Sequence, residues 1–310
     1  PHHRHLHCIA RRQRQMCIRD RDNAATTALS PAAIQAMTKT MTVFGNPSST
    51  HSHGREASKL LRQAREDIAQ ALHTQSNKIL FTSGGTESNN TAIKGYALRH
   101  QNRGKHIVTT AIEHHAVLEV VEYLVDKFGF EATFVQPVDG QIRAADIKKA
   151  LRPDTILVSV MAVNNETGAM LPIKEIGELL HEHPAVFHVD AVQAIGKLPI
   201  YPDELGIDFL SASAHKFHGP KGVGFLYAKK MDFDNFMHGG DQEEKHRAGT
   251  ENLISITGMA AALSDSTEHL EENLAHAQDL KDSLLADLSD IEHYLNESQP
   301  SLPYVINLGF

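Results

Sequence analysis

Hydrophobic and polar positions along the chain follow two alternating periods from residue 22 onward. Short apolar runs bounded by turn residues predict buried strands at 78–82, 106–110, 131–135, 155–163, 186–190, 207–213 and 223–228. Apolar residues at helical spacing predict helices at 32–41, 54–73, 116–128, 144–151 and 173–181. Strands and helices that alternate in this way predict an α/β fold, with a mainly parallel sheet of about seven strands and helices on both faces.

The C-terminal part of the chain has a different pattern. Residues 260–295 predict one long amphipathic helix, with room for a single break. Five of its apolar positions fall seven residues apart: Leu263, Leu270, Ala277, Leu284 and Ile291. A coiled coil and a helix packed on one face of a domain both fit this spacing, and the second is favoured. Residues 303–310 read as an unfinished strand.

The first 21 residues differ from the rest. They hold six arginines, a histidine-rich start and both cysteines, Cys8 and Cys17, without any periodicity. A metal-binding tract and a transit peptide are two interpretations, but a non-native or disordered extension is favoured. We therefore predict three parts: an extension at 1–21, a large domain at 22–258, and at 259–310 a linking helix with the start of an incomplete small domain.

Composition limits the classes of protein that are possible. Of the 310 residues, 41% are hydrophobic and 22% are charged, which is ordinary for a globular protein. The net charge of −8 argues against nucleic acid as a partner, and no apolar stretch reaches the roughly 18 residues that a membrane span needs. No cysteine follows residue 21, so we expect no disulfide framework, no metal site and a reducing, cytoplasmic setting.

Lys216 is the first candidate for chemistry. It stands between two expected strands, in a stretch of small and hydroxyl residues that includes Ser213 and His215. The pKa of a lysine falls readily on burial, and the neutral amine can then act as a nucleophile or base. A lysine at a strand end beside a Gly-Pro turn is the structural alternative, and the lone residue does not decide between them.

A glycine turn at residues 83–90 is the second candidate. The expected strand 78–82 runs directly into Ser-Gly-Gly-Thr, which opens a helix. Free N–H groups and the helix dipole can bind a phosphate at such a turn, and Thr86 and Ser88 could add hydroxyl donors. For the turn taken alone, simple helix capping is the favoured explanation, because many helices begin with these residues.

Further polar residues come just after expected strands. His114 could cap the helix that follows it or face a ligand, and one amide of the pair Asn164 and Asn165 could brace a turn or touch a ligand. Asp190 ends an apolar strand and needs either a backbone donor or a cationic nitrogen as its partner. Because the carboxyl ends of parallel strands share one edge, these side chains, with Gln193, the glycine turn and Lys216, are expected to form one site.

Nine segments of the chain resemble the NifS/IscS-like cysteine desulfurases, which are class V, fold-type I enzymes that use pyridoxal phosphate. The segments are DNAATT (22–27), FGNPSSTH (44–51), FTSGGTESNN (81–90), EHHAV (113–117), VNNETG (163–168), HVDAVQAIGKLPI (188–200), SASAHKFHGPKG (211–222), MHGG (237–240) and RAGTEN (247–252). Their order and spacing are continuous from Asp22 to Phe310, so the resemblance covers nearly the whole chain.

The resemblance implies a role for each candidate residue. Lys216 would form the Schiff base with the cofactor and then move protons, and His114 would stack on the ring and assist. Asp190 would pair with the ring nitrogen. Gln193 and, of the two asparagines, Asn165 would bind the ring hydroxyl. The phosphate would be held by Gly85, Thr86, Ser213 and His215, with Thr250 reaching the phosphate of a neighbouring subunit in a homodimer.

The implied reaction takes sulfur from L-cysteine, leaving L-alanine and an enzyme persulfide. A sulfur-acceptor protein, such as an iron–sulfur scaffold, or tRNA thiolation would then use the sulfur. The family's nucleophilic cysteine and carboxylate-binding arginine lie beyond the point where this chain stops, and neither Cys8 nor Cys17 matches that cysteine. We therefore expect a C-terminally truncated chain that binds cofactor but does not turn over as a desulfurase.

Two other interpretations share the same cofactor residues. One is a different class V enzyme, such as a selenocysteine lyase, a β-lyase or an aminotransferase, although RAGTEN and NPSSTH favour the desulfurases. The other is an inactive scaffold that keeps the dimer and its partner surface.

Overall fold

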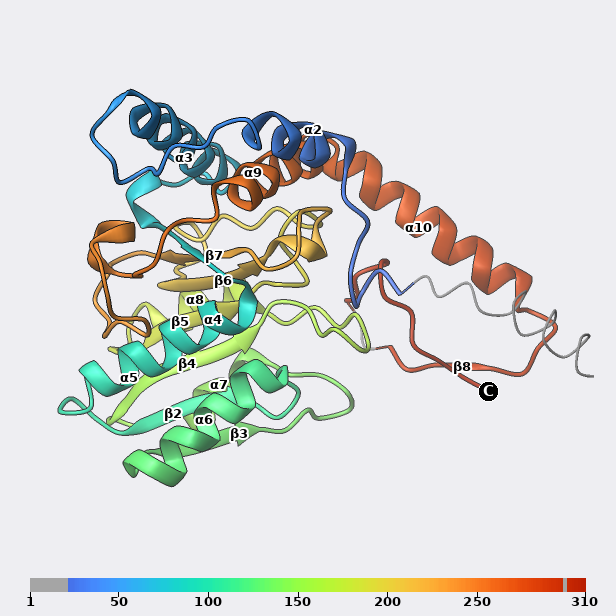
Figure 1. The fold of residues 1–310 in the computed structure, drawn as a ribbon. Coiled ribbons are helices and arrows are strands. Elements are labelled where there is room, and N and C mark those ends of the chain that lie inside the picture. Colours follow the sequence, from blue (N-terminus) through green and yellow to red (C-terminus); the bar gives the residue numbers. More distant parts are fainter. Residues whose placement is uncertain (1–21, 298–299) are drawn as a thin grey trace, which may run out of the picture.

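The computed structural model describes residues 22–297 and 300–310. Its central feature is a seven-stranded sheet in the order β1-β7-β6-β5-β4-β2-β3 (Figure 1). The strands are β1 (Ile79–Thr82), β2 (His106–Thr110), β3 (Glu131–Val135), β4 (Thr155–Met161), β5 (Val186–Asp190), β6 (Phe209–Ser213) and β7 (Gly224–Ala228). The pairs from β6 to β3 are parallel, and β7 is antiparallel to both β1 and β6. The mainly parallel α/β sheet predicted from the sequence is confirmed.

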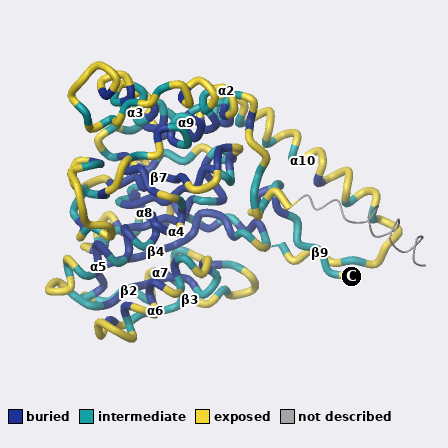
Figure 2. The backbone as a smooth tube through the Cα atoms, in the orientation of Figure 1, coloured by how far each residue is buried: buried dark blue, intermediate teal, exposed yellow. Residues whose placement is uncertain are grey.

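Helices cover both faces of the sheet, as the alternating pattern predicts. One face packs on α6 (His115–Phe128) and on a continuous helix made of α4 (Gly85–Asn90), the π-helical η2 (Thr91–Gly95) and α5 (Tyr96–Arg99). The other face packs on α7 (Ala144–Ala150) and α8 (Ile173–Leu180), and the same core continues into α3 (Ser52–Ala71). Figure 2 shows most strands of this sheet as deeply buried, and the edge strand β3 as the exception. They are covered on both sides, which explains their unbroken apolar runs.

The C-terminal helix differs from its prediction. The single break that the sequence allowed lies at His269, but the bounds differ: α9 (Leu253–Glu268) begins before residue 260, and α10 (Leu270–Asp287) ends before residue 295. Residues after 287 leave the helix, and β8 (Tyr294–Leu295) pairs with β9 (Leu308–Gly309), so the strand expected at 303–310 is only two residues long. A helix packed on a domain is the better description of α9, which lies against α2 (Pro31–Thr40) and α3. The predicted division at 258/259 falls inside α9 and stays a prediction.

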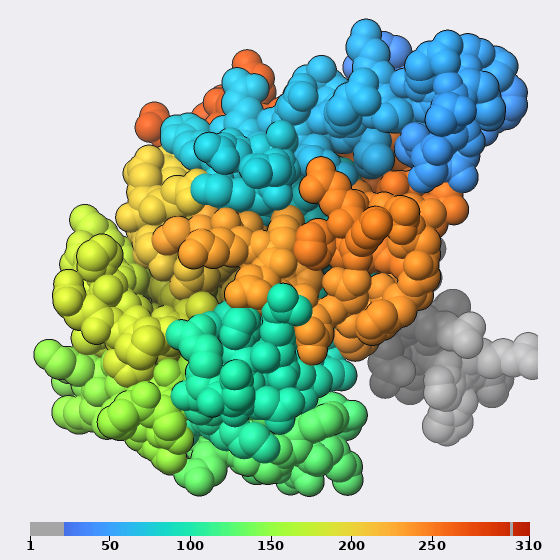
Figure 3. All heavy atoms as spheres, turned by 90° about the vertical axis from the view of Figure 1, so that its left-hand side faces the viewer, coloured from blue at the N-terminus to red at the C-terminus, as the bar shows by residue number. Residues whose placement is uncertain are grey.

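Side chains beyond the sheet fix the N-terminal and connecting segments. Ser30 caps α2 by accepting the N–H of Ala33, and Pro31 occupies the first helical position, where its missing N–H costs no hydrogen bond. The connection between β7 and α9 contains the short η4 (Gln242–Lys245), and the orange surface of Figure 3 shows this part of the chain between the blue N-terminal helices and the cyan α4–α5 region. Within the described residues, no helix is long and apolar enough to cross a membrane.

Candidate active site

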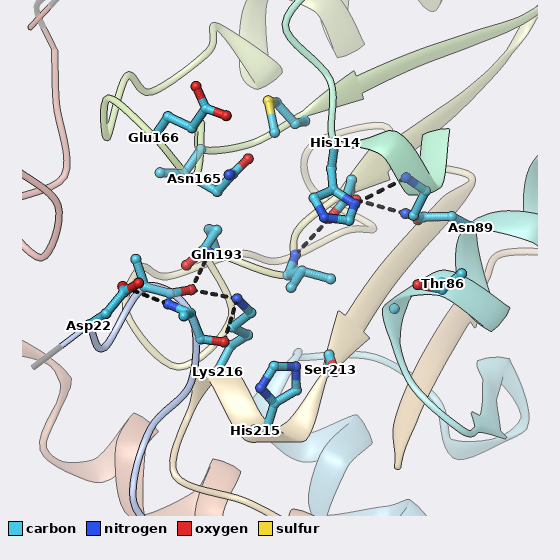
Figure 4. Close-up of a pocket in the computed structure, with 18 residues that line it drawn as sticks. Asp22, Thr86, Asn89, His114, Asn165, Glu166, Gln193, Ser213, His215 and Lys216 are labelled. Atoms are coloured by element: carbon cyan, nitrogen blue, oxygen red, sulfur yellow. Dashed lines mark hydrogen bonds between the residues drawn. The ribbon is translucent and has the colours of Figure 1, made fainter. Parts of the chain in front are cut away.

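One cavity of about 440 Å³ opens at the carboxyl ends of the parallel strands (Figure 4). Nine of the ten residues predicted for the site line it: Gly85, Thr86, His114, Asn165, Asp190, Gln193, Ser213, His215 and Lys216. They come from five separate segments of the chain, so the parallel sheet brings them together as predicted. The tenth, Thr250, is exposed in the segment before α9 and does not line this cavity.

Lys216 lies in the 3₁₀ turn η3 (Ala214–Lys216), which directly follows β6. Its amine donates hydrogen bonds to the carbonyls of Ala24 and Ala25, the latter at 3.0 Å. Burial lowers the pKa of Lys216, while the carboxylates of Asp22 and Asp190 oppose that shift. The amine is therefore closer to its neutral, nucleophilic form than an exposed lysine would be.

Asp190 ends β5 with a buried carboxyl group. One oxygen accepts the backbone N–H of Val192 at 3.0 Å, and the other accepts the amide of Asn89 at 2.7 Å. Among the residues that the structure describes, no lysine, arginine or histidine forms an ion pair with it. Burial raises the pKa of Asp190. The nearby charges of His114 and Lys216 oppose that shift without forming an ion pair. A buried acid whose hydrogen-bond partners are all neutral is the expected counterpart of a cationic ligand atom.

Asn89 was not identified from the sequence. It comes one helical turn after Gly85 and therefore faces the same cavity, which is the signal that could have identified it. Its side-chain oxygen is buried without a hydrogen-bond partner among the described residues. Asp22 is a second lining residue that received no role, because the terminal position of DNAATT gave no hint that it approaches Lys216.

The glycine turn forms one wall of the cavity. Gly84 has φ +148°, a conformation that favours glycine, and a Cβ on Gly85 would lie 2.6 Å from Val192 Cγ2. The helix that begins at Gly85 has no side-chain cap on its first N–H groups, and Gly85 and Thr86 line the cavity together with Ser213 and His215. Burial, followed by the charge of Lys216, lowers the pKa of His215. The wall combines free N–H groups with neutral hydrogen-bonding side chains, a combination suited to an oxyanion.

Ser88 does not contribute to this wall, so that part of the prediction is wrong. Its hydroxyl is fully buried between Thr82 Oγ1, at 2.8 Å, and the carbonyl of Phe225, at 3.1 Å. The Ser88 side chain faces the sheet, where it contacts Thr82 of β1 and Phe225 of β7.

His114 combines the two interpretations that the sequence left open. Its Nδ1 accepts the N–H of Ala116 at 3.0 Å, so it caps α6, and the same ring lines the cavity. Because Nδ1 uses its lone pair as an acceptor, the helix cap leaves Nε2 as the nitrogen that carries a proton in the neutral ring.

The adjacent asparagines have separate tasks. Asn164 Oδ1 accepts the backbone N–H groups of Glu166 and Thr167 at 3.0 and 2.9 Å, and its amide donates to the carbonyl of Ile112 at 3.0 Å. Asn165 lines the cavity. The turn is therefore braced by Asn164, which leaves Asn165 available to a ligand.

Exchanging these two asparagines for alanine should separate stability from binding. We expect Asn164→Ala to lower the free energy of unfolding by about 2 kcal/mol, because it removes several hydrogen bonds from a buried turn. Asn165→Ala should change that free energy by less than about 0.5 kcal/mol. Urea unfolding of both variants is the measurement, and equal destabilisation by the two would contradict the division of tasks.

Comparison with known proteins identifies the family to which the chain belongs. Residues 21–310 match the model of the aminotransferase class-V family. A solved structure described as a NifS-like protein superposes with a TM-score of 0.87 at 38% identity, covering 91% of this chain and 78% of that one. A second, described as SspA in complex with cysteine, has a TM-score of 0.85 at 34% identity and covers 93% and 82%. The chain belongs to the class-V aminotransferase family, whose members typically depend on pyridoxal phosphate.

Within that family the chain is a homologue of cysteine desulfurase IscS. It is 47% identical over 298 residues to cysteine desulfurase IscS of Dictyoglomus turgidum, a match that spans 93% of this chain and 75% of the relative. The putative cysteine desulfurase IscS 1 of Bacillus subtilis is 46% identical over 295 residues, spanning 93% and 78%. The family resemblance drawn from the nine sequence segments is confirmed.

Proposed function

We propose that the cavity binds pyridoxal phosphate through Lys216. Its residues fit that group on three counts: an amine of lowered pKa, a buried carboxyl group with neutral partners only, and a glycine turn that admits an oxyanion. The carboxyl group of Asp190 is the observation that carries the proposal. Burying an acid without a cation is costly, and a protonated ring nitrogen would offset that cost.

Each lining residue then has a defined task. Lys216 attaches to the cofactor's aldehyde and carries protons, and Asp190 accepts the ring N–H. His114 would stack on the ring, while Asn165 and Gln193 would hold the ring oxygen. Gly85, Thr86, Ser213 and His215 hold the phosphate, and the exposed Thr250 would reach the phosphate of a second subunit. When bound, pyridoxal phosphate supplies an electron sink for breaking bonds at an amino-acid α-carbon.

We further propose L-cysteine as the substrate, with sulfur passing to a thiol and then to an acceptor protein such as an iron–sulfur scaffold or to tRNA thiolation. Support comes from the homologues named cysteine desulfurase and from the structural relative described in complex with cysteine. Residues 22–310 contain no cysteine, and Cys8 and Cys17 lie outside the described residues. This segment therefore supplies the cofactor site, and the thiol that would receive sulfur is not in it. The lack of cysteine in 22–310 agrees with a reducing, cytoplasmic setting, which is part of the same proposal.

A second candidate is a cofactor-binding scaffold without desulfurase turnover, which needs no cysteine in residues 22–310. Both candidates require the Lys216 attachment. They differ in whether sulfide and alanine form when L-cysteine is added to the loaded protein.

Lys216→Ala tests the proposal. The wild-type protein mixed with pyridoxal phosphate should show the visible absorbance band of a lysine-linked cofactor, and borohydride should fix the cofactor to Lys216, as located by peptide mass spectrometry. The variant should lose both signals. Lys221→Ala is the matched control, because Lys221 is an exposed lysine five residues further on. Folded wild-type protein without the band would refute the proposal.

A further inference from the structure

Lys197 is a buried lysine that the proposed function does not use. It lies in the turn after β5, at the lysine of the HVDAVQAIGKLPI segment, and is only 6% exposed. Among the described residues its amine donates one hydrogen bond, to Gln193 Oε1 at 3.0 Å. The ring of Tyr304 lies 5.8 Å from the amine.

These contacts do not offset the free-energy cost of burying the Lys197 amine. Burial, followed by the charge of Lys216, lowers the pKa of Lys197 to about 8. An amine with a single neutral acceptor and a distant ring gains less than it loses by leaving water. A hydrophobic side chain would stabilise this position at least as well. The lysine therefore needs an explanation other than stability.

Lys197 determines which end of the Gln193 amide faces the cavity. A lysine amine only donates, so the oxygen of that amide must point toward it. The amide nitrogen then points the other way and donates to the carbonyl of Ala24 at 2.9 Å. The same carbonyl accepts the Lys216 amine. Rotating the amide by half a turn would place its N–H groups against Lys197 and its oxygen against a carbonyl.

We propose that Lys197 is a positioning residue, which holds the Gln193 amide with its nitrogen toward the cavity. One N–H of that nitrogen bonds Ala24, and the second is left for an acceptor atom of the ligand. This inference rests on the proposed function, since the acceptor would be the ring oxygen of pyridoxal phosphate.

The C-terminal segment supports the same arrangement. Leu302, which is fully buried, donates its N–H to the carbonyl of Gly168 at 2.8 Å, and the ring of Tyr304 in the same segment lies 5.8 Å from the Lys197 amine. The segment therefore packs on the turn that carries Asn165 and on the lysine that orients Gln193. The C-terminal segment therefore supports both side-chain amides proposed to bind the ring oxygen, those of Asn165 and Gln193.

A double-mutant cycle with Lys197→Met and Gln193→Leu tests the inference. Each single variant should weaken pyridoxal phosphate binding about tenfold and shift the absorbance band of the bound cofactor, because each removes the same oriented donor. The double variant should bind no more weakly than Gln193→Leu alone. Lys281→Met is the matched control, since Lys281 on α10 is also a buried lysine, 7% exposed, but pairs with Glu297. It should leave affinity and band unchanged. Lys197→Gln serves as the second variant if Lys197→Met does not fold, because the shorter side chain places its amide further from Gln193.

Two results would overturn the inference: full affinity with an unshifted band in folded Lys197→Met or Lys197→Gln, or fully additive losses in the double variant. An apoprotein measurement keeps it separate from the proposed function. Lys216 shares the Ala24 carbonyl with Gln193, so Lys197→Met should change the rate at which acetic anhydride acetylates Lys216 at least about twofold. If wild-type protein fails to bind cofactor, the proposed function falls. An unchanged acetylation rate would then refute the positioning role as well.

Discussion

Asp190→Asn is expected to make the apoprotein more stable at neutral pH and to weaken its binding of pyridoxal phosphate about a hundredfold, which is a loss of about 2.7 kcal/mol. The apoprotein becomes more stable because Asp190→Asn removes a buried acid whose hydrogen-bond partners are all neutral. The loss arises because the same acid is proposed to pair with the ring nitrogen. Opposite signs for stability and binding are the mark of a residue kept for its ligand.

The hydrogen bonds around residue 190 can accommodate the substitution of asparagine for aspartate. Asn89 donates to Asp190 through its amide nitrogen, while its oxygen has no partner among the described residues. When the acid becomes an amide, Asn89 can rotate and accept from it through that free oxygen. The folded apoprotein therefore loses no hydrogen bond, and we expect its free energy of unfolding to rise by about 1–3 kcal/mol at neutral pH.

The stability that Asp190 contributes depends on pH in a definite direction. Burial raises the pKa of Asp190 in the folded state, so folded protein holds this proton more tightly than unfolded protein. Stability from this group is present below the unfolded pKa of about 4 and is lost as the pH rises through the folded pKa. The advantage of Asp190→Asn should therefore be large at neutral pH and fade toward about pH 4.

Urea unfolding across pH and a cofactor titration measure the two effects. Asp208→Asn is the matched control: burial also raises the pKa of Asp208, but it accepts the N–H of Phe187 at the other end of β5. It should leave cofactor affinity unchanged. If Asp190→Asn binds pyridoxal phosphate as tightly as the wild type, the assignment of the ring nitrogen to Asp190 is wrong.

The fold was predictable because its signals are local and repeated. Each strand is an apolar run and each covering helix has an amphipathic period, so their alternation identifies the parallel sheet. The break at His269 was harder to place, because the apolar repeat continues through it from Leu263 to Leu270. Only the packing of α9 on α2 and α3, a long-range contact, decides where that helix ends.

The site was predictable to the extent that strand ends identify it. Lys216, Asp190 and His114 follow strands, and the sheet gathers them. Asn89 and Lys197 can be identified only from contacts in the folded chain. Asn89 bonds Asp190, which lies 101 residues away in the sequence. Lys197 bonds Gln193, whose own role must be known before that of Lys197 can be inferred. Residues that act through another residue leave no motif of their own.

The segment between β7 and α9 depends on one buried ion pair. The Glu243 side chain is 2% exposed and meets the two terminal nitrogens of Arg65, with a shortest distance of 2.6 Å. It also accepts the N–H of Phe81 on β1 at 2.9 Å. Glu243, Glu244 and Lys245 have φ values of +47°, +54° and +73°, a left-handed backbone that costs about 1 kcal/mol per residue. The bidentate pair holds this backbone in place.

This segment leads directly to the cofactor wall. Two residues after Lys245, Arg247 pairs with Glu87 at 2.9 Å, and Glu87 follows Thr86 in the helix that begins at the glycine turn. Thr250, the residue proposed to reach a second subunit, follows in the same connection. The position of these groups therefore depends on the anchoring of Glu243.

Arg65→Met is expected to lower the free energy of unfolding by about 3–5 kcal/mol, because it leaves the Glu243 carboxylate buried without its cation. Arg62→Met is the matched control: Arg62 lies one turn earlier on α3, is exposed and bonds only Ser58 Oγ among the described residues, so its loss should cost less than about 0.5 kcal/mol. Urea unfolding measures both. Trypsin offers a local measurement, because the side chain of Lys245 is 75% exposed but its backbone is held in the left-handed turn. Cleavage after Lys245 should accelerate in Arg65→Met alone, and equal stability of the two variants would show that the pair does not anchor this segment.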